Sequence, residues 1–280
     1  MEGLYRIVNL SRPVIYIIIT VAILVPLLRP LGIPIVVGKD VQNFYNLVNN
    51  LKSGDVMWLD SHISLSAAVE CVPQMVAIAY HAQSRGVKIV MLAMSADGQP
   101  FAERLLQEIL GRGAKYGEDI VYLGFVPGGE PGVASLMADL HKTVPNDYKG
   151  TPLASLPLTS KVKNAKDLAI VVPVTSDATA PDYWTRQIKP YPTVALTMAS
   201  QASLWPKIQP YLPTGQIKAA LNGSRGAAEY ELLIKRPGQA VGSMDATSVA
   251  YLTFVVFIIL GNLAYHLKPK GKTAEGGAKS

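Results

Sequence analysis

Two apolar segments lie near the ends of the chain, and a long stretch of mixed polarity separates them. The first runs from Pro13 to Leu28 without a charged side chain, and apolar residues continue past Arg29 to position 33. Sixteen helical residues rise only about 24 Å, so Arg12 and Arg29 would have to extend to the two interfaces of a bilayer. The pattern predicts a first transmembrane helix over 13–33.

The second apolar segment, Ala246 to Leu267, contains 22 residues without Asp, Glu, Lys or Arg and is long enough to cross a membrane. Gly261 and Asn262 lie in its last third. A small residue beside an amide is typical of a helix face that packs on another helix within a membrane. We therefore expect helix packing at Gly261 and Asn262; the alternative is that headgroups solvate Asn262.

The first segment could instead be a cleaved signal peptide. Arg29 and Pro30 follow it where a cleavage site would need small residues, which favours an uncleaved signal-anchor. Positive charges near the two segments predict the orientation. The cytoplasmic side would carry Arg6, Arg12, Lys268, Lys270, Lys272 and Lys279, and the other side Arg29, Lys39, Lys235 and Arg236. This excess predicts that both termini are cytoplasmic and that the middle domain is extracytoplasmic.

The middle of the chain, residues 39–245, alternates short apolar runs with amphipathic stretches. A helix is predicted over 40–52, because its apolar residues recur at helical spacing. The predicted strands are 56–61, 87–94, 119–126, 168–175, 193–198 and 216–222, and the predicted helices that follow them are 64–84, 99–112, 131–142, 181–189, 200–209 and 225–234. Apolar strands that alternate with helices predict an α/β domain with a Rossmann-like, mainly parallel sheet and helices on both faces.

Residues 144–167 interrupt this alternation. The segment contains three prolines and has no clear period, so we interpret it as a connection between two halves, 39–143 and 168–245.

Composition narrows the classes of function. Hydrophobic residues make up 49% of the chain and charged residues only 16%, which excludes a disordered protein. The net charge of +6 comes partly from the tail 268–280, which is expected to contact anionic lipid; the short stub 1–12 is expected in the cytoplasm. No dense basic stripe indicates nucleic-acid binding. Cys71 is the only cysteine and the four histidines have no ligand spacing, so neither a metal site nor a cofactor is predicted.

Parallel sheets bind ligands beyond the carboxyl ends of their strands, and those ends are polar here. They carry Asp60, Ser61, His62, Ser95, Asp97, Thr175, Ser176, Asp177, Ser200, Gln201 and Asn222. The simplest interpretation is that these are ordinary helix caps and turns.

Two glycine-rich loops between a strand and a helix are more specific. They are PGGEPG at 127–132 and NGSRG at 222–226. Backbone N–H groups in such loops can bind a phosphate or carboxylate, which makes Gly128, Gly129, Glu130, Gly223, Ser224 and Arg225 candidate ligand-binding residues. Neither loop matches a nucleotide-binding fingerprint, and tight turns need glycine in any case.

No residue is assigned a catalytic role. Asp60, Ser61 and His62 are consecutive, so their side chains diverge on a strand, and no G-x-S-x-G motif is present. A membrane-tethered serine hydrolase is therefore only the third hypothesis.

Five strings carry a family resemblance. PLGIPI follows the first apolar segment, and VYLGFVPGGE, DYKGTPL, GSRGAAEYE and SMDATSVAYL follow in order. Together they resemble an uncharacterised family of prokaryotic membrane proteins in which two spans flank an α/β domain. The resemblance implies this architecture only, and it implies no activity, cofactor or site residue. We expect the protein in a prokaryotic cytoplasmic (inner) membrane.

The leading hypothesis is a membrane-anchored, non-catalytic structural or interaction subunit of a larger, homo-oligomeric or mixed membrane complex. Its partners would be the lipid bilayer and copies of itself or other membrane subunits. The alternative is an extracytoplasmic module that binds or senses a small anion at the two glycine-rich loops.

Overall fold

The computed structural model describes residues 11–267. The chain divides into two compact units. One is an α/β unit, Pro34–Val241, and the other is a helical unit formed by the described parts of Met1–Ile33 and Gly242–Ser280.

Six parallel strands form one sheet at the centre of the α/β unit, which confirms the α/β, parallel-sheet part of the predicted fold class. The strands are β1 (Val56–His62), β2 (Lys88–Ala93), β3 (Ile120–Phe125), β4 (Ile170–Thr175), β5 (Ala195–Ser200) and β6 (Ala219–Asn222). Their order across the sheet is β3-β2-β1-β4-β5-β6, and every neighbouring pair is parallel. Strands β1, β2 and β3 therefore follow one another toward one edge of the sheet, and β4, β5 and β6 follow one another toward the other edge.

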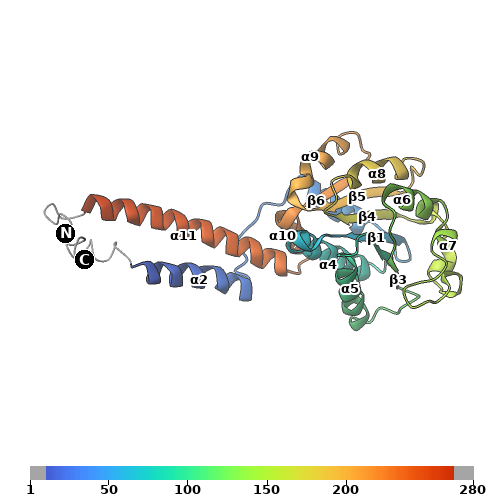
Figure 1. The fold of residues 1–280 in the computed structure, drawn as a ribbon, viewed down its shortest axis with the longest axis horizontal. Helices are drawn as coiled ribbons and strands as arrows, with labels where there is room; N and C mark the ends of the chain where they lie inside the picture. Colours follow the sequence, from blue (N-terminus) through green and yellow to red (C-terminus); the bar gives the residue numbers. More distant parts are fainter. Residues whose placement is uncertain (1–10, 268–280) are drawn as a thin grey trace, which may run out of the picture. The chain divides into compact units, whose positions relative to one another are not determined.

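Helices cover both faces of this sheet (Figure 1). One face carries α3 (Lys39–Asn49), α4 (Ala68–Ser84), α5 (Gln99–Gly111) and α10 (Gly223–Leu233). The other face carries α6 (Gly129–Ala138), α8 (Ala180–Ile188) and α9 (Trp205–Ile208). This double coverage explains why the strands are apolar on both sides.

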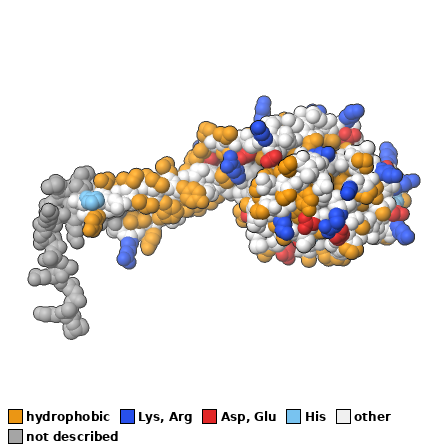
Figure 2. All heavy atoms as spheres, turned by 90° about the horizontal axis from the view of Figure 1, so that it is seen from above, with side chains coloured by type: hydrophobic (Ala, Val, Ile, Leu, Met, Phe, Trp, Pro, Cys, Tyr) orange, Lys and Arg blue, Asp and Glu red, His pale blue; other side chains and the backbone are white. Residues whose placement is uncertain are grey.

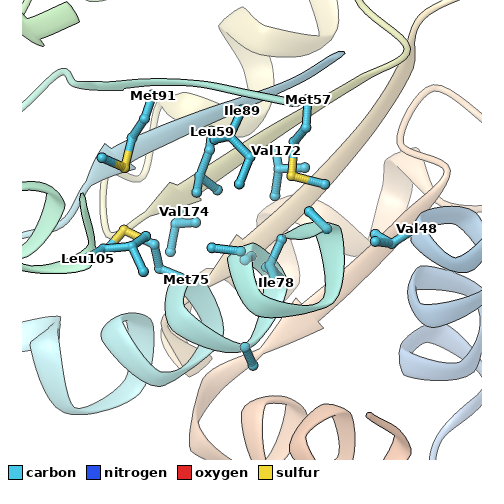
Figure 3. Packing of buried hydrophobic residues seen from close by; sticks show 14 of the residues in the cluster. Val48, Met57, Leu59, Met75, Ile78, Ile89, Met91, Leu105, Val172 and Val174 are labelled. Atoms are coloured by element: carbon cyan, nitrogen blue, oxygen red, sulfur yellow. The ribbon is translucent and has the colours of Figure 1, made fainter. Parts of the chain in front are cut away.

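Alternate residues of each strand fill two separate cores. On β1, Met57 and Leu59 belong to the core under α4, whereas Trp58 belongs to the core under α6 and α8. Figure 3 shows Met57 and Leu59 facing Met75 and Ile78 of α4. Because side chains alternate along a strand, a slip of one residue would exchange the two cores.

Several predicted boundaries are wrong inside the α/β unit. The helix predicted over 40–52 ends at Asn49, and the strand predicted over 193–198 lies two residues later. Three further elements differ for identifiable reasons. The helix predicted over 131–142 breaks at Asp139, whose backbone is extended and whose side chain accepts from the Lys142 N–H to start α7 (Leu140–Thr143). The helix predicted over 200–209 divides into 3-10 turns around α9, where prolines remove backbone donors. The strand predicted over 216–222 begins only at Ala219, because the Ile217 N–H donates to a turn carbonyl.

The connection at 144–167 packs closely against the α/β unit. It contains the 3-10 turns Leu153–Ser155, Thr159–Lys161 and Ala165–Asp167, and it buries Leu153 and Val162 in the core under α6 and α8. The connection is therefore part of the packed layer on that face.

The first apolar helix is shorter than predicted. α2 (Arg12–Leu28) has 17 residues and ends before Pro30, since the residue preceding proline disfavours helical backbone. The N–H groups of Leu31, Gly32 and Ile33 donate to the Asp245 carboxylate at 2.7, 2.9 and 3.1 Å. The predicted helix over 13–33 is thus wrong at its carboxyl end.

The second apolar helix, α11 (Gln239–Leu267), begins seven residues before the predicted start at 246. Within residues 11–267 it is the one helix long and apolar enough to cross a membrane; α2 is apolar but shorter. The two helices approach closely at Gly242, where a Cβ atom would lie 3.3 Å from the Pro26 carbonyl oxygen. Figure 2 shows hydrophobic side chains gathered over this helical unit.

A buried histidine joins three helices of the α/β unit. His81 on α4 is 5% exposed, its Nδ1 lies 2.7 Å from the Tyr230 hydroxyl of α10, and its ring stacks on Tyr45 of α3 at 4.8 Å. Burial, helped by the charge of Arg85, lowers the pKa of His81 to about 4. The folded protein therefore holds this imidazole neutral over most of the acid range.

Acidification from pH 7 to pH 5 should destabilise the wild type more than His81→Gln. Above about pH 6.5 His81 is neutral in both the folded and the unfolded protein. Below this pH the unfolded chain binds a proton at His81, whereas the folded protein does not. The free energy of unfolding therefore falls until the pH reaches the folded pKa of about 4. Over this interval the loss should be about 2 kcal/mol. Denaturant unfolding of both proteins at the two pH values measures the difference, since other titrating groups contribute equally. An equal response would contradict a neutral, buried His81.

Candidate functional site at the carboxyl ends of the strands

The carboxyl ends of β1 and β4 lie side by side at the point in the sheet where the strand order reverses. His62 at the end of β1 pairs with Thr175 at the end of β4. The connections that follow these two strands run toward opposite edges of the sheet. In doubly wound folds, ligands bind in the crevice between two such diverging connections.

His62 links β1 to α8 and to the loop after β4. Its Nδ1 lies 3.0 Å from the Tyr183 hydroxyl, and its Nε2 lies 3.9 Å from a carboxylate oxygen of Asp177. Burial lowers the pKa of His62, and the negative charge of Asp177 opposes that shift. The ring is 16% exposed, so it can meet a molecule from outside.

Asp60 lies on the same strand as His62, and its side chain has no exposed surface. Two residues before His62 on β1, it points to the same face of the sheet. Its Oδ1 accepts the Met94 N–H at 3.3 Å, whereas its Oδ2 has no hydrogen-bond partner. Burial raises the pKa of Asp60 well above its usual value, and Asp177 adds to the rise.

Tyr183 is the fourth member of the cluster. Burial raises its pKa first, and the carboxylates of Asp60 and Asp177 raise it further. The cluster Asp60–His62–Asp177–Tyr183 therefore combines a phenol, an imidazole held largely neutral and a carboxyl group with one unused oxygen. Such a set suits hydrogen bonding to a small polar molecule.

The serines at this edge bond to one another and to the backbone. The Ser176 hydroxyl accepts the Ser64 N–H at 2.8 Å and donates to the Ser64 hydroxyl at 3.0 Å. Among residues 11–267, no serine hydroxyl makes a hydrogen bond to a histidine ring. The geometry thus gives no support to the serine-hydrolase hypothesis.

The first glycine-rich loop lies at the end of β3. Gly128 and Gly129 have φ of 134° and 50°, values that favour glycine. Glu130 accepts two hydrogen bonds from Arg186 of α8, at 2.6 and 2.8 Å, and one from Gln187. These donors hold the pKa of Glu130 at about 2, so it stays ionised and engaged.

The second glycine-rich loop lies at the end of β6. Gly223 has φ of 62°, and a Cβ atom there would lie 2.8 Å from a Glu70 carboxylate oxygen. Arg225 donates to Glu229 at 2.7 Å, and the other oxygen of Glu229 accepts the Gly38 N–H. Ser224 is half-buried beside them.

The six candidate residues do not meet in one place. Gly128, Gly129 and Glu130 follow one edge strand, β3, whereas Gly223, Ser224 and Arg225 follow the other, β6, with four strands between them. Glu130 does lie close enough to Tyr183 for its charge to raise the pKa of that phenol. The first loop therefore borders the Asp60–His62–Asp177–Tyr183 cluster, and the second does not.

Sequence reasoning identified Asp60, His62 and Asp177 as strand-end residues but missed Tyr183 and Gln74. Gln74 on α4 is fully buried; its amide donates to the Ser200 and Gly223 carbonyls, and its Oε1 has no partner. Tyr183 and Gln74 both lie within helices, and more than 100 positions of sequence separate each from the partners named above. Nothing in the spacing of the residues indicates these contacts. Within the described part of the chain, no three His, Cys, Asp or Glu side chains are placed to hold a metal.

Comparison with known proteins leaves the family open. No family model matches the chain. No curated protein matches it. A solved structure with some similarity is the signal recognition particle 54 kDa protein from Aeropyrum pernix K1 in complex with GDP, with 14% identity and a TM-score of 0.36 over 91% of this chain. The match spans 62% of that protein, and similarity of this extent assigns no function. The family resemblance seen in the sequence stays a prediction.

Gly98 sets the distance between α5 and the end of β1. The Ser61 hydroxyl donates to the Gly98 carbonyl at 2.9 Å, and a Cβ atom at position 98 would overlap the Ser61 carbonyl oxygen. We expect Gly98→Ala to displace β1 beside the cluster and to destabilise the protein by about 1–3 kcal/mol. The measurement is thermal unfolding of the purified protein.

Gly111→Ala at the other end of α5 is the matched control. Nothing lies within 4 Å of its Cβ position, so alanine should leave stability unchanged or raise it slightly. Equal melting temperatures for the two variants would show that close approach at Gly98 is unimportant.

Proposed function

We propose that this chain is a membrane-anchored, non-catalytic interaction subunit of a larger membrane complex. The observation that carries the proposal is the apolar surface of α11, since only 6% of its most apolar stretch is buried. Its exposed large side chains are Tyr251, Leu252, Phe254, Val255, Val256, Ile258, Ile259, Leu263 and Tyr265. In water such an exposed apolar surface would favour aggregation, whereas in a bilayer it is the usual lipid-facing surface of a spanning helix.

In this proposal α2 is the second anchor. Its 17 residues rise about 26 Å, and Arg12 and Arg29 at its ends can extend to the two interfaces. Asp245 supports the pairing, because it is buried and binds the segment that follows α2. Both termini would be cytoplasmic and the α/β unit extracytoplasmic at a prokaryotic inner membrane; the basic tail 268–280 lies outside the described residues.

Gly261 and Asn262 would provide the contact with a further helix. Nothing lies within 4 Å of a Cβ position at Gly261, so this part of α11 is open in the single chain. The Asn262 amide donates to the Ile258 carbonyl at 2.8 Å but stays exposed, which leaves its carbonyl oxygen for a partner. A glycine with open space beside an amide suits close helix packing.

Gly261→Leu should reduce the mass of the particle extracted from native membranes. The added side chain would hold a second helix away, whereas Val256→Leu adds one methylene on a different side of α11 and should leave the assembly intact. Size-exclusion chromatography with mass detection and protein identification measures both. A wild-type particle that contains a single chain would overturn the proposal, and an unchanged mass in Gly261→Leu would place the contact elsewhere.

A second candidate function is small-molecule binding at the Asp60–His62–Asp177–Tyr183 cluster. The buried, unpartnered Oδ2 of Asp60 favours it, because a buried polar atom without a partner is costly and indicates a missing hydrogen bond. Asp177 and the nearby Glu130 are acidic, whereas the raised pKa of Asp60 favours its protonated form. The ligand of this cluster would therefore be a neutral or cationic molecule that has both a hydrogen-bond acceptor and a donor. Anion binding at the glycine-rich loops stays a separate prediction.

Small amines and polyols should raise the melting temperature of the wild-type protein in detergent. A ligand at 100 times its dissociation constant stabilises by about 2.7 kcal/mol, which amounts to several degrees. Asp60→Leu should abolish the shift, since it removes the unused polar atom and keeps a similar shape, and Asp40→Leu on α3 should retain it. A shift that survives in Asp60→Leu, or no shift with any compound, would count against this site.

A further inference from the structure

The half-buried and the exposed residues of α11 lie on different faces of the helix. Between positions 251 and 265, the half-buried residues recur every three or four positions, so they share one face that other parts of the chain cover. They are Thr253, Phe257, Leu260 and Ala264. Residues of the opposite face are exposed and form a stripe, which we call the 251–265 stripe. It consists of Tyr251, Val255, Ile258, Asn262 and Tyr265.

The 251–265 stripe has the spacing of a surface on which two helices pair. Its residues follow one another at intervals of four, three, four and three positions, which is the heptad pattern of helices that pack side by side over several turns. Phe254 and Gly261 flank the stripe on one side, and Leu252 and Ile259 flank it on the other. None of these residues is Asp, Glu, Lys or Arg, so two such surfaces can meet without repulsion between like charges.

Asn262 is the one amide in the stripe. Its side-chain N–H donates to the Ile258 carbonyl at 2.8 Å, and within residues 11–267 its exposed carbonyl oxygen accepts no hydrogen bond. An amide also carries a second N–H. In hydrocarbon, polar atoms without partners are costly, and amides in spanning helices therefore form hydrogen bonds between helices. Each copy of Asn262 thus has one acceptor and one donor to offer.

A second copy of this chain complements these two groups by symmetry. Copies of α11 anchored in one membrane would be parallel, a step that rests on the proposed membrane anchoring. In a parallel pair with heptad spacing, each residue of the stripe faces the same residue of the other copy. Asn262 would then face Asn262, with the acceptor of each amide opposite the donor of the other. A different helix would need a donor and an acceptor together at one matching position.

We propose that a second copy of this chain packs on the 251–265 stripe, in a parallel dimer in which the two Asn262 amides exchange hydrogen bonds. The apolar residues of the stripe provide close packing, and the amide pair fixes the register, because a slip of the helices would leave both amides unpaired in lipid. This inference deepens the proposed function by naming the partner as a copy of the chain itself.

Disulfide cross-linking of the full-length protein in native membranes tests the contact. Val255→Cys and Ile258→Cys place a thiol on the stripe, at positions that are 52% and 63% exposed in the single chain. Val256→Cys and Leu263→Cys are the matched controls, at positions 43% and 46% exposed beside the stripe. Mild oxidation should give a covalent dimer with the first pair and little with the second, since a disulfide requires Cα atoms within about 7 Å. Cys71 is buried, so the wild type should give none.

Asn262→Leu tests the amide pair. It keeps a similar volume, and in lipid its apolar side chain gains no hydrophobic attraction from another helix. Loss of the hydrogen bonds should weaken dimerisation by about 3- to 30-fold, measured as energy transfer between labelled full-length copies in phosphatidylcholine–phosphatidylglycerol vesicles. Asn262→Gln keeps the amide and should restore most of the transfer. Equal transfer in Asn262→Leu and the wild type would contradict pairing through the amide and indicate that headgroups solvate Asn262.

This inference and the proposed function fail in different ways. Equal cross-linking at all four positions would indicate random collision and would overturn the dimer. A particle that contains other subunits but gives no cross-link at Val255→Cys or Ile258→Cys would overturn the dimer and leave the proposed function in place. A full-length chain that does not associate with membranes would instead contradict the proposed anchoring.

Discussion

The parallel arrangement of the six strands is the constraint on which the rest of the structure depends. A parallel sheet is stable only when both faces are buried, so every connection must carry a helix or a packed segment across one face. The same rule brings all carboxyl ends of the strands to one edge. It places Asp60, His62 and Asp177 together there, although β1 and β4 are separated in sequence by two further strands and the long connection at 144–167.

Three carboxylates accept hydrogen bonds from backbone N–H groups in the segments of the chain next to its apolar ends. Glu229 accepts the Gly38 N–H, and Glu231 accepts three N–H groups at the start of α11. Within the helical unit, Asp245 does the same for residues 31–33. Because buried N–H groups without partners are costly, these three acids complete the hydrogen bonding of the segment after α2 and of the first N–H groups at α3 and α11.

Most of the fold follows from local pattern. The strands at 56–61, 87–94 and 168–175 are confirmed with small changes, because apolar runs that alternate with amphipathic helices are compatible with few other architectures. The errors occur where a single contact overrides periodicity. Asp139 ends a helix by capping the next one, and Pro30 together with Asp245 ends α2 before the apolar stretch is complete. A hydrophobic pattern contains no information about either contact.

The sequence by itself determined the α/β class, the parallel sheet, the apolar character of both ends and the polar residues at the strand ends. Tertiary structure alone decided which of those residues meet. Strand order separates Glu130 from Arg225 by the full width of the sheet and brings Tyr183 to His62 across 121 positions. It also pairs Glu130 with Arg186 and leaves one oxygen of Asp60 unused. The physical reason is that periodicity records which face of an element is buried, whereas side-chain partners depend on the order and offset in which elements pack.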